Sequence, residues 1–305
     1  MEVARELGLP GVKAVRTKAP NRMLEIQAEG YVVSPSTPLL STNITENTYV
    51  CGSNRHGQLG VPGATQLSEP KLIQGAGRWA TLAFSSGHAA GLTGSGQLYT
   101  WGRNSFGQLG QAQQDECIDV PSKVEAVQTL EFRSVACGES HTVAATADEV
   151  YVAGSNRRWQ LGIAEQPRDA PLMQFTKVPA LSNWMVVQVV CGRSHTVVLT
   201  AQSHVFSWGD NTSGQLGTGD TRDRMTPTLV DALWALPVVQ LAAGASHSLA
   251  LTSNGFMYVW GSNDEGQLGL LPEAERAPSL VSSPAKPPPR SMRTPGEPGY
   301  SRLSG

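Results

Sequence analysis

Trp208-Gly-Asp-Asn211-Thr-Ser-Gly214-Gln-Leu-Gly217 is a ten-residue motif that recurs along the chain. The glycine at the second position of the motif recurs at intervals of 50, 52, 55 and 52 residues. Its five copies are Gly52, Gly102, Gly154, Gly209 and Gly261. A self-similar period of this length is the mark of a repeat architecture. A second motif, a histidine followed five residues later by threonine, precedes four of the copies: His88, His141, His195 and His247.

Each repeat has the pattern of short strands. Val197–Thr200 is a brief apolar run, and Met257–Trp260 is aromatic and β-branched. Asn254-Gly255 between such runs is a strong hairpin signal. One such unit is a small sheet that must stack on its neighbours to bury its faces. The sequence therefore predicts an all-β fold, a β-propeller of about five recognisable repeats of about 52 residues with four strands each.

The two motifs together resemble the repeat of the regulator of chromosome condensation family. The resemblance lies in Trp-Gly-x-Asn-x-x-Gly-Gln-Leu-Gly and the upstream Gly-x-x-His-(Ser/Thr)-x-x-Leu-Thr, and it covers residues 46–285. It implies a β-propeller that usually closes with seven blades. The founding member of that family exchanges guanine nucleotides on a small GTPase, so the resemblance also implies that activity as one function to consider.

The number of repeats departs from the family pattern. Seven blades at this period need about 360 residues, which exceeds the 305 of this chain. A degenerate first half near residues 39–42 lacks its histidine. Three interpretations stay open: a closed five-bladed ring, a truncated product or isoform of a longer protein, and an open arc. An open arc exposes an edge and favours self-association or pairing with another chain.

The composition of the flanks predicts three segments. Residues 1–45 form a partly disordered N-terminal segment, residues 46–271 the propeller, and residues 272–305 a proline-rich disordered tail. The tail contains Lys286-Pro-Pro-Pro-Arg290, a candidate ligand for a proline-recognition module. Ser283-Pro284 and Thr294-Pro295 are candidate phosphorylation sites. A solvated tail without a partner is the simpler interpretation of each.

Charge and cysteine content exclude several classes. With 23 Lys and Arg against 25 Asp and Glu, the net charge is −2, which argues against direct nucleic-acid binding. No apolar run is long enough to span a membrane. The four cysteines form no CxxC pair, so a reduced intracellular location, cytoplasmic or nuclear, is expected.

The residues of the repeat motifs are predicted to be structural. A metal site would need several ligands close together, whereas each repeat carries one histidine. An imidazole more often ties a turn by hydrogen bonds to backbone groups. Tryptophans at one repeat position should pack between blades. The predicted structural residues are His88, His141, His195, His247, Trp101, Trp208 and Trp260.

No enzyme, metal or cofactor motif is present in the sequence. The variable pairs inside each Asn-x-x-Gly turn are therefore the candidate binding surface, because one face of the scaffold presents them together. In the third repeat Trp159 replaces the turn glycine, a costly choice if that position needs a positive φ. Sequence drift and a recognition feature both account for it. The predicted partner-binding face is Arg55, His56, Phe106, Arg157, Arg158, Trp159, Asp264 and Glu265.

The sequence thus favours a non-catalytic repeat module that binds protein partners as an adaptor or regulator. The alternative is a guanine nucleotide exchange factor for a small GTPase, with residues 112–123 or 163–173 as the inserted wedge loop. A third interpretation is an array cut from a larger enzyme, such as a ubiquitin ligase with propeller domains.

Overall fold

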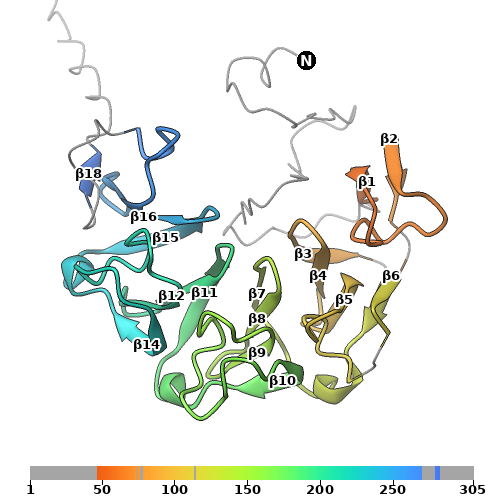
Figure 1. Ribbon diagram of the computed structural model, residues 1–305, viewed down its shortest axis with the longest axis horizontal. Coiled ribbons are helices and arrows are strands. Elements are labelled where there is room, and N and C mark those ends of the chain that lie inside the picture. Colours follow the sequence, from red (N-terminus) through yellow and green to blue (C-terminus); the bar gives the residue numbers. More distant parts are fainter. Residues whose placement is uncertain (1–46, 74, 76–77, 113–114, 270–278, 282–305) are drawn as a thin grey trace, which may run out of the picture.

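The fold consists of antiparallel sheets that follow one another around an arc (Figure 1). The structure is a computed structural model, and it describes residues 47–73, 75, 78–112, 115–269 and 279–281. Four of the five described sheets have four strands, and the first has two. An all-β architecture built from stacked small sheets is confirmed.

The strands follow the repeats in order. The first sheet contains β1 (Tyr49–Ser53) and β2 (Gln66–Leu72). The second contains β3 (Trp79–Phe84), β4 (His88–Thr93), β5 (Leu98–Arg103) and β6 (Cys117–Lys123). The third contains β7 (Ser134–Cys137), β8 (His141–Ala145), β9 (Val150–Gly154) and β10 (Leu172–Lys177). The fourth contains β11 (Val186–Cys191), β12 (His195–Thr200), β13 (Val205–Gly209) and β14 (Arg224–Leu229). The fifth contains β15 (Val238–Ala243), β16 (His247–Thr252), β17 (Met257–Gly261) and β18 (Ser279–Val281).

Each four-stranded sheet is a meander, and we call it a blade; the blades are numbered two to five after their repeats. The first strands, β3, β7, β11 and β15, contact one another along the inside of the arc. Three 3-10 helices link an outer strand to the next inner strand: η1 (Glu125–Val127), η2 (Pro179–Leu181) and η3 (Asp231–Leu233).

Two sets of turns share one end of every blade. The Gly-x-x-His turns join the first strand to the second, and the Asn-x-x-Gly turns join the third to the fourth. The amide of Asp210, at the start of the latter turn, donates to the carbonyl of Ser194 in the former at 2.9 Å. We call this end the turn face. The hairpins between second and third strands and the 3-10 helices lie at the opposite end.

The apolar core lies between neighbouring blades. Val197, Leu199 and Val205 of the fourth blade pack with Trp260 and Ala250 of the fifth, and all five are almost fully buried. A buried side chain of this size contributes about 1.5–3 kcal/mol. Stacking of blades, rather than the single sheet, therefore stabilises the fold.

The arc is open, since the β1–β2 sheet and the fifth blade lie at its two ends (Figure 1). The described residues therefore form an open arc and not a closed five-sheet ring. Strand β18 lies beyond the predicted propeller boundary at residue 271, inside the predicted tail of residues 272–305, and pairs with β17 through Val259↔Ser279 and Met257↔Val281. This strand completes the fifth blade, as the fourth strand does in the others. The predicted segment 1–45, the degenerate motif at 39–42 and residues 282–305 lie outside the described residues.

Candidate functional site

The ten-residue motif is a self-contained turn whose side chains satisfy its own backbone. In the fourth blade Asn211 Oδ1 accepts from the amide of Leu216 at 3.0 Å, and Gln215 Oε1 accepts from that of Ser213 at 2.9 Å. Gly214 and Gly217 have φ of 76° and 69°, which an L residue rarely adopts. The Asn and Gln bonds recur in all five turns. The two residues after the Asn are thereby held out on the turn face.

The repeat histidines couple neighbouring blades. His141 Nε2 lies 3.1 Å from Thr196 Oγ1 in the next blade, and that hydroxyl donates to the carbonyl of Gln160 at 3.2 Å. The hydroxyl proton is thus used, so the tautomer assigned to His141 carries its proton on Nε2. Trp208 Nε1 donates to the same carbonyl at 2.8 Å. His88 and His195 make the same bond to the hydroxyls of Thr142 and Ser248, both at 2.9 Å. The imidazole partner is therefore a hydroxyl of the next blade, where the sequence had suggested backbone groups.

These histidines are neutral. Burial lowers the pKa of His88 and of His141 to about 3, and that of His195 to about 4. Burial also lowers the pKa of His247. A neutral ring with one N–H suits the bond to a hydroxyl. Within the part of the chain that the structure describes, no group of three His, Cys, Asp or Glu residues is placed to hold a metal ion.

The tryptophans lie between blades, and the third repeat replaces its tryptophan with a different residue. Ala153 occupies the repeat position held by Trp208 in the next blade. Phe175, from the outer strand β10, fills the vacated space: a Cβ on Gly110 would lie 2.4 Å from its ring. At the matching place, a Cβ on Gly162 would lie 2.7 Å from Trp208. Sequence reasoning missed Phe175 because it lies outside the repeated motif.

Two cysteines at one repeat position are buried and unreactive by environment. Burial raises the pKa of Cys191 to about 12 and that of Cys137 well above its usual range. A thiol that stays protonated is a poor nucleophile. Both behave as small apolar side chains of the inner strands.

Aromatic and arginine side chains gather where the second and third turns meet. The Arg103 and Arg157 guanidinium carbons lie 5.7 and 5.0 Å from the centre of the Phe106 ring. The Arg168 guanidinium lies 5.6 Å from the Trp159 ring, and its Nε donates to the carbonyl of Arg157 at 3.0 Å. We call these five residues the basic-aromatic cluster. Arg103 and Arg168 were not predicted, since they flank the turns and do not lie inside them.

Trp159 has a φ of 61°, close to that of the glycines it replaces. The turn position thus does need a left-handed backbone, and tryptophan adopts it at a cost of about 1–2 kcal/mol. The stacked Arg168 offsets part of that cost, since a cation over an exposed ring contributes about 0.5–1 kcal/mol.

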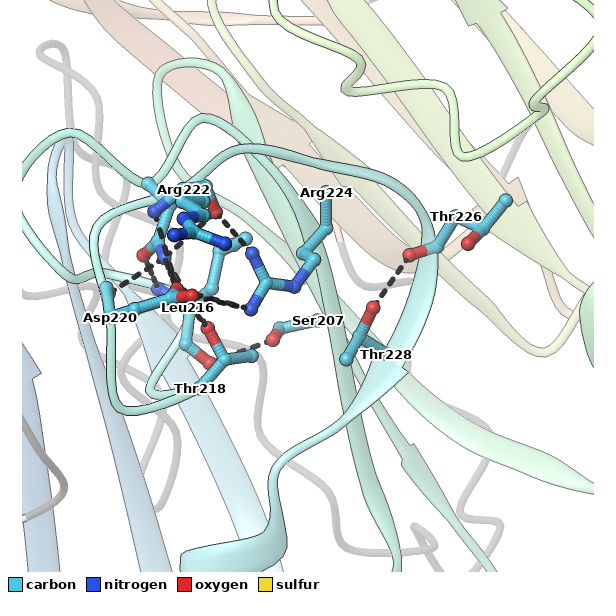
Figure 2. Close-up of polar contacts among 9 residues, drawn as sticks. Ser207, Leu216, Thr218, Asp220, Arg222, Arg224, Thr226 and Thr228 are labelled. Atoms are coloured by element: carbon cyan, nitrogen blue, oxygen red, sulfur yellow. Dashed lines mark hydrogen bonds and ion pairs between the residues drawn. The ribbon is translucent and has the colours of Figure 1, made fainter.

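Arg158 turns away from the cluster towards the fourth blade. Its Nη1 lies 3.9 Å from Asp210 and 3.7 Å from Asp223. The neighbouring loop is built around Asp220, which accepts from Thr218 Oγ1 at 3.1 Å and from Arg224 at 3.0 Å (Figure 2). The hydrogen bond from Arg224 is the main cause that lowers the pKa of Asp220. These carboxylates are engaged within the protein and are poorly suited to bind a partner.

The remaining predicted residues lie at the ends of the arc. Arg55 and His56 are exposed on the first turn, and Asp264 and Glu265 are exposed on the last. The structure therefore brings Phe106, Arg157 and Trp159 together with two further arginines, and it leaves the acidic pair on a distant blade. Among the variable turn residues, those of the first three repeats include basic and aromatic side chains and those of the fifth are acidic, while exposed Asp115 and Glu116 lie beside the second turn. No helix among the described residues is long and apolar enough to cross a membrane.

A family model described as "RCC1-like domain" matches residues 5–294. The chain belongs to the RCC1-like domain family. This RCC1-like domain has the fold that the recurring motifs predicted, in an arc of fewer described blades than the seven usual for the family.

Three known proteins illustrate the range of RCC1-like relatives. Over 271 residues, 86% of this chain, it is 32% identical to human E3 ubiquitin-protein ligase HERC2, of which it spans 6%. Over 210 residues, 66% of this chain, it is 35% identical to the mitochondrial RCC1 domain-containing protein RUG3 of Arabidopsis thaliana, of which it spans 46%. The crystal structure of Prp20p from Saccharomyces cerevisiae superposes with a TM-score of 0.65 at 23% identity, covering 78% of this chain and 59% of that one. The chain thus spans less than half the length of these two curated relatives, and Prp20p supports the fold alone.

Proposed function

We propose that this RCC1-like domain is a non-catalytic protein-binding module whose turn face holds an acidic segment of a partner. The observation that carries the proposal is the basic-aromatic cluster, which spans two blades and stands on rigid turns. Arginine and aromatic residues are the types most often found at the energetic centre of protein interfaces. Arg157 is exposed, and Phe106 and Trp159 are half-buried, so the cluster is accessible.

The Phe106 and Trp159 rings support the neighbouring arginines, whose guanidinium carbons lie 5.0 to 5.7 Å from the ring centres. A guanidinium matches a carboxylate with two parallel N–H···O bonds, so an arginine held beside a ring is partly prepared for a carboxylate. Because the turns beneath are fixed by the Asn and Gln bonds, little conformational entropy is lost when a partner binds.

The charge distribution supports one orientation of the partner. Asp264 and Glu265 at the fifth repeat repel carboxylates, whereas Arg55 and the basic-aromatic cluster attract them. An acidic segment is therefore held over the first three repeats, with any basic flank towards the fifth. Complementarity of this kind gives specificity and association rate more than affinity.

Guanine nucleotide exchange is the second function to test, because Prp20p, which shares this fold, binds Gsp1p and histones. Support from the proposed wedge loops is weak. Of residues 112–123, Cys117–Lys123 is strand β6. Residues 163–173 lead directly into β10 at Leu172. Both stretches therefore belong to the outer strand of a blade or to the segment that leads into it. The repeat period alone did not distinguish such a strand from an inserted loop.

Affinity capture of the full chain from cell extract separates the two functions. One capture contains EDTA, which strips nucleotide from small GTPases, and the other contains magnesium and excess GTP. A partner held equally in both supports the binding module. A GTPase held only in EDTA and released by GTP supports exchange activity.

A matched pair of variants tests the site itself. The variant R157A/W159A removes the two third-turn side chains that belong to the basic-aromatic cluster, and T212A/S213A truncates the equivalent fourth turn. The proposal predicts that the first loses the captured partner and the second retains it. Retention of every partner by the first variant contradicts the proposed surface.

A further inference from the structure

The loop between the fourth and fifth blades departs from its counterparts. The residues that cap η1 and η2, Gln128 and Ser182, continue the helical backbone with ψ of −19° and −15°. At the same place after η3, Trp234 has φ −57° and ψ 135°, and Ala235 follows with a φ of 65°. The three connections have the same length, since the repeat histidine of the next blade stands 14 residues after the last residue of each 3-10 helix. Because Ala235 is left-handed although the loop has no insertion, the backbone after Trp234 follows a different path from the backbone after Gln128 and Ser182.

The bent loop holds an exposed tryptophan against a supporting stack. Trp234 is 55% exposed, although it stacks on His204 with ring centres 4.5 Å apart and planes 30° apart. His204 meets the edge of Trp184 at 5.1 Å. Exposed Met185 adjoins Trp184 in the chain. We call these four side chains the aromatic step. Tryptophan stands there where the equivalent residues, Gln128 and Ser182, are polar.

The aromatic step lies at the end of the blades opposite the turn face. His204 ends the hairpin between β12 and β13, and Trp234 follows a 3-10 helix, both features of that end. It is therefore separate from the basic-aromatic cluster and is not used by the proposed function. Exposed Trp234 and Met185, supported by half-buried Trp184 and His204, form an apolar patch of the kind that interaction sites use.

The chain itself leaves the fifth blade at this same end. Val281, the last residue of β18, pairs with Met257, the first residue of β17 after its hairpin. Lys286-Pro287-Pro288-Pro289-Arg290 follows a few residues later. Six extended residues from Val281 to Pro287 reach about 20 Å. The width of a four-stranded blade is about 14 Å and the spacing of stacked sheets about 10 Å, so the neighbouring loop lies within reach.

We propose that the aromatic step binds the Pro287–Pro289 segment of the same chain in cis. A run of prolines forms a polyproline II helix, whose rings pack on exposed tryptophan and whose fixed backbone loses little entropy on binding. The flanking charges agree, since Asp231 is exposed three residues before Trp234 and the prolines lie between Lys286 and Arg290. Docking buries an exposed tryptophan and places the tail over the boundary between the fourth and fifth blades.

Limited trypsin digestion of the full chain tests the proposal, because the Arg290–Ser291 bond adjoins the docked prolines. Its cleavage rate is followed by mass spectrometry, with the distant Arg302–Leu303 bond as internal reference. The variant W234Q places at this position the residue type that the equivalent loop has at Gln128. We expect it to raise the rate of cleavage at Arg290, relative to that at Arg302, at least fivefold. P288A/P289A, which keeps Pro287 so that the Lys286–Pro287 bond stays resistant to trypsin, should raise it equally. W159A, which alters a tryptophan on the other face, should leave it unchanged.

Two further measurements keep the outcome decisive. W234F retains a ring and should keep most of the protection, and circular dichroism confirms that each variant is folded. A labelled peptide of residues 282–293 should bind P288A/P289A more tightly than the wild-type chain, because the cis segment no longer competes. Equal cleavage in the wild-type chain and W234Q overturns the proposal. Protection that rises with protein concentration also overturns it, since the occupant is then a second copy.

Discussion

The hydroxyls of Thr142 and Thr196 occupy equivalent positions in the third and fourth blades. They should contribute differently to stability, because the third blade lacks the repeat tryptophan. Thr142 Oγ1 donates to the carbonyl of Gln108 at 2.6 Å, and Thr196 Oγ1 donates to that of Gln160 at 3.2 Å. Each hydroxyl also accepts from a histidine of the preceding blade. The carbonyl of Gln160 has a second donor, Trp208, whereas alanine replaces that tryptophan in the blade of Thr142.

Replacing each threonine with the isosteric valine isolates this difference. T196V leaves one buried group unpaired, the N–H of the preceding histidine, at a cost of about 1–3 kcal/mol. T142V leaves two, the histidine N–H and the Gln108 carbonyl. Both threonines are fully buried, so water does not replace the lost partners. We expect T142V to lower the free energy of unfolding by about 1–2 kcal/mol more than T196V.

Thermal unfolding by calorimetry measures the difference. For a domain of this size, 1 kcal/mol shifts Tm by about 2–4 °C. A control restores the missing indole donor. A tryptophan at position 153 needs the space that Phe175 fills, so the background variant is A153W/F175A. In this background the difference in unfolding free energy between T142V and T196V should become smaller. Equal or reversed losses for T142V and T196V refute the reasoning that hydroxyl and indole share one carbonyl.

Three further outcomes are expected. In G192A the new Cβ meets His195 Cε1 at 2.1 Å in a fully buried site, so Tm should fall by several degrees, and an unchanged Tm in a thermal melt contradicts the packing. Because burial lowers the pKa of His88, His141 and His195, the unfolded chain takes up protons below its ordinary pKa of about 6.5 while the folded chain does not. Urea titrations should therefore show stability that is complete above pH 6.5 and falls from there to pH 4, by up to about 1.4 kcal/mol per pH unit for each histidine, and a flat profile refutes this. In Ellman titration Cys117, which is exposed, should react in the native protein, whereas Cys137 and Cys191 should react only after unfolding; early reaction of all three argues against their burial.

The repeat period predicted the fold well because the motif residues act locally. Asn211 and Gln215 bond to amides within their own turn, so the same letters produce the same geometry in every blade. Such a rule can be recognised from spacing alone. The strand β18 was harder to predict, since Ser279–Val281 carries no repeat motif.

The candidate surface was predicted in part. Phe106, Arg157 and Trp159 stand inside the variable turns and were expected to share a face. Arg103 and Arg168 complete the cluster from neighbouring strand and loop positions, and only the contact between two turns selects them. The aromatic step was not predicted at all, because Trp184, His204 and Trp234 come from separate connections that meet only after the blades stack.

Binding of a captured partner to charge-reversed protein tests whether the turn face is the binding surface. The variant R157E reverses the charge of the cluster arginine inside the third turn, and T212A/S213A alters the equivalent fourth turn without a charge change. Titration at low and at physiological salt gives Kd for each. We expect at least a tenfold weaker Kd for R157E and a smaller salt dependence, with the control within twofold of wild type. Equal affinity of all three proteins contradicts the assignment of the turn face as the binding surface.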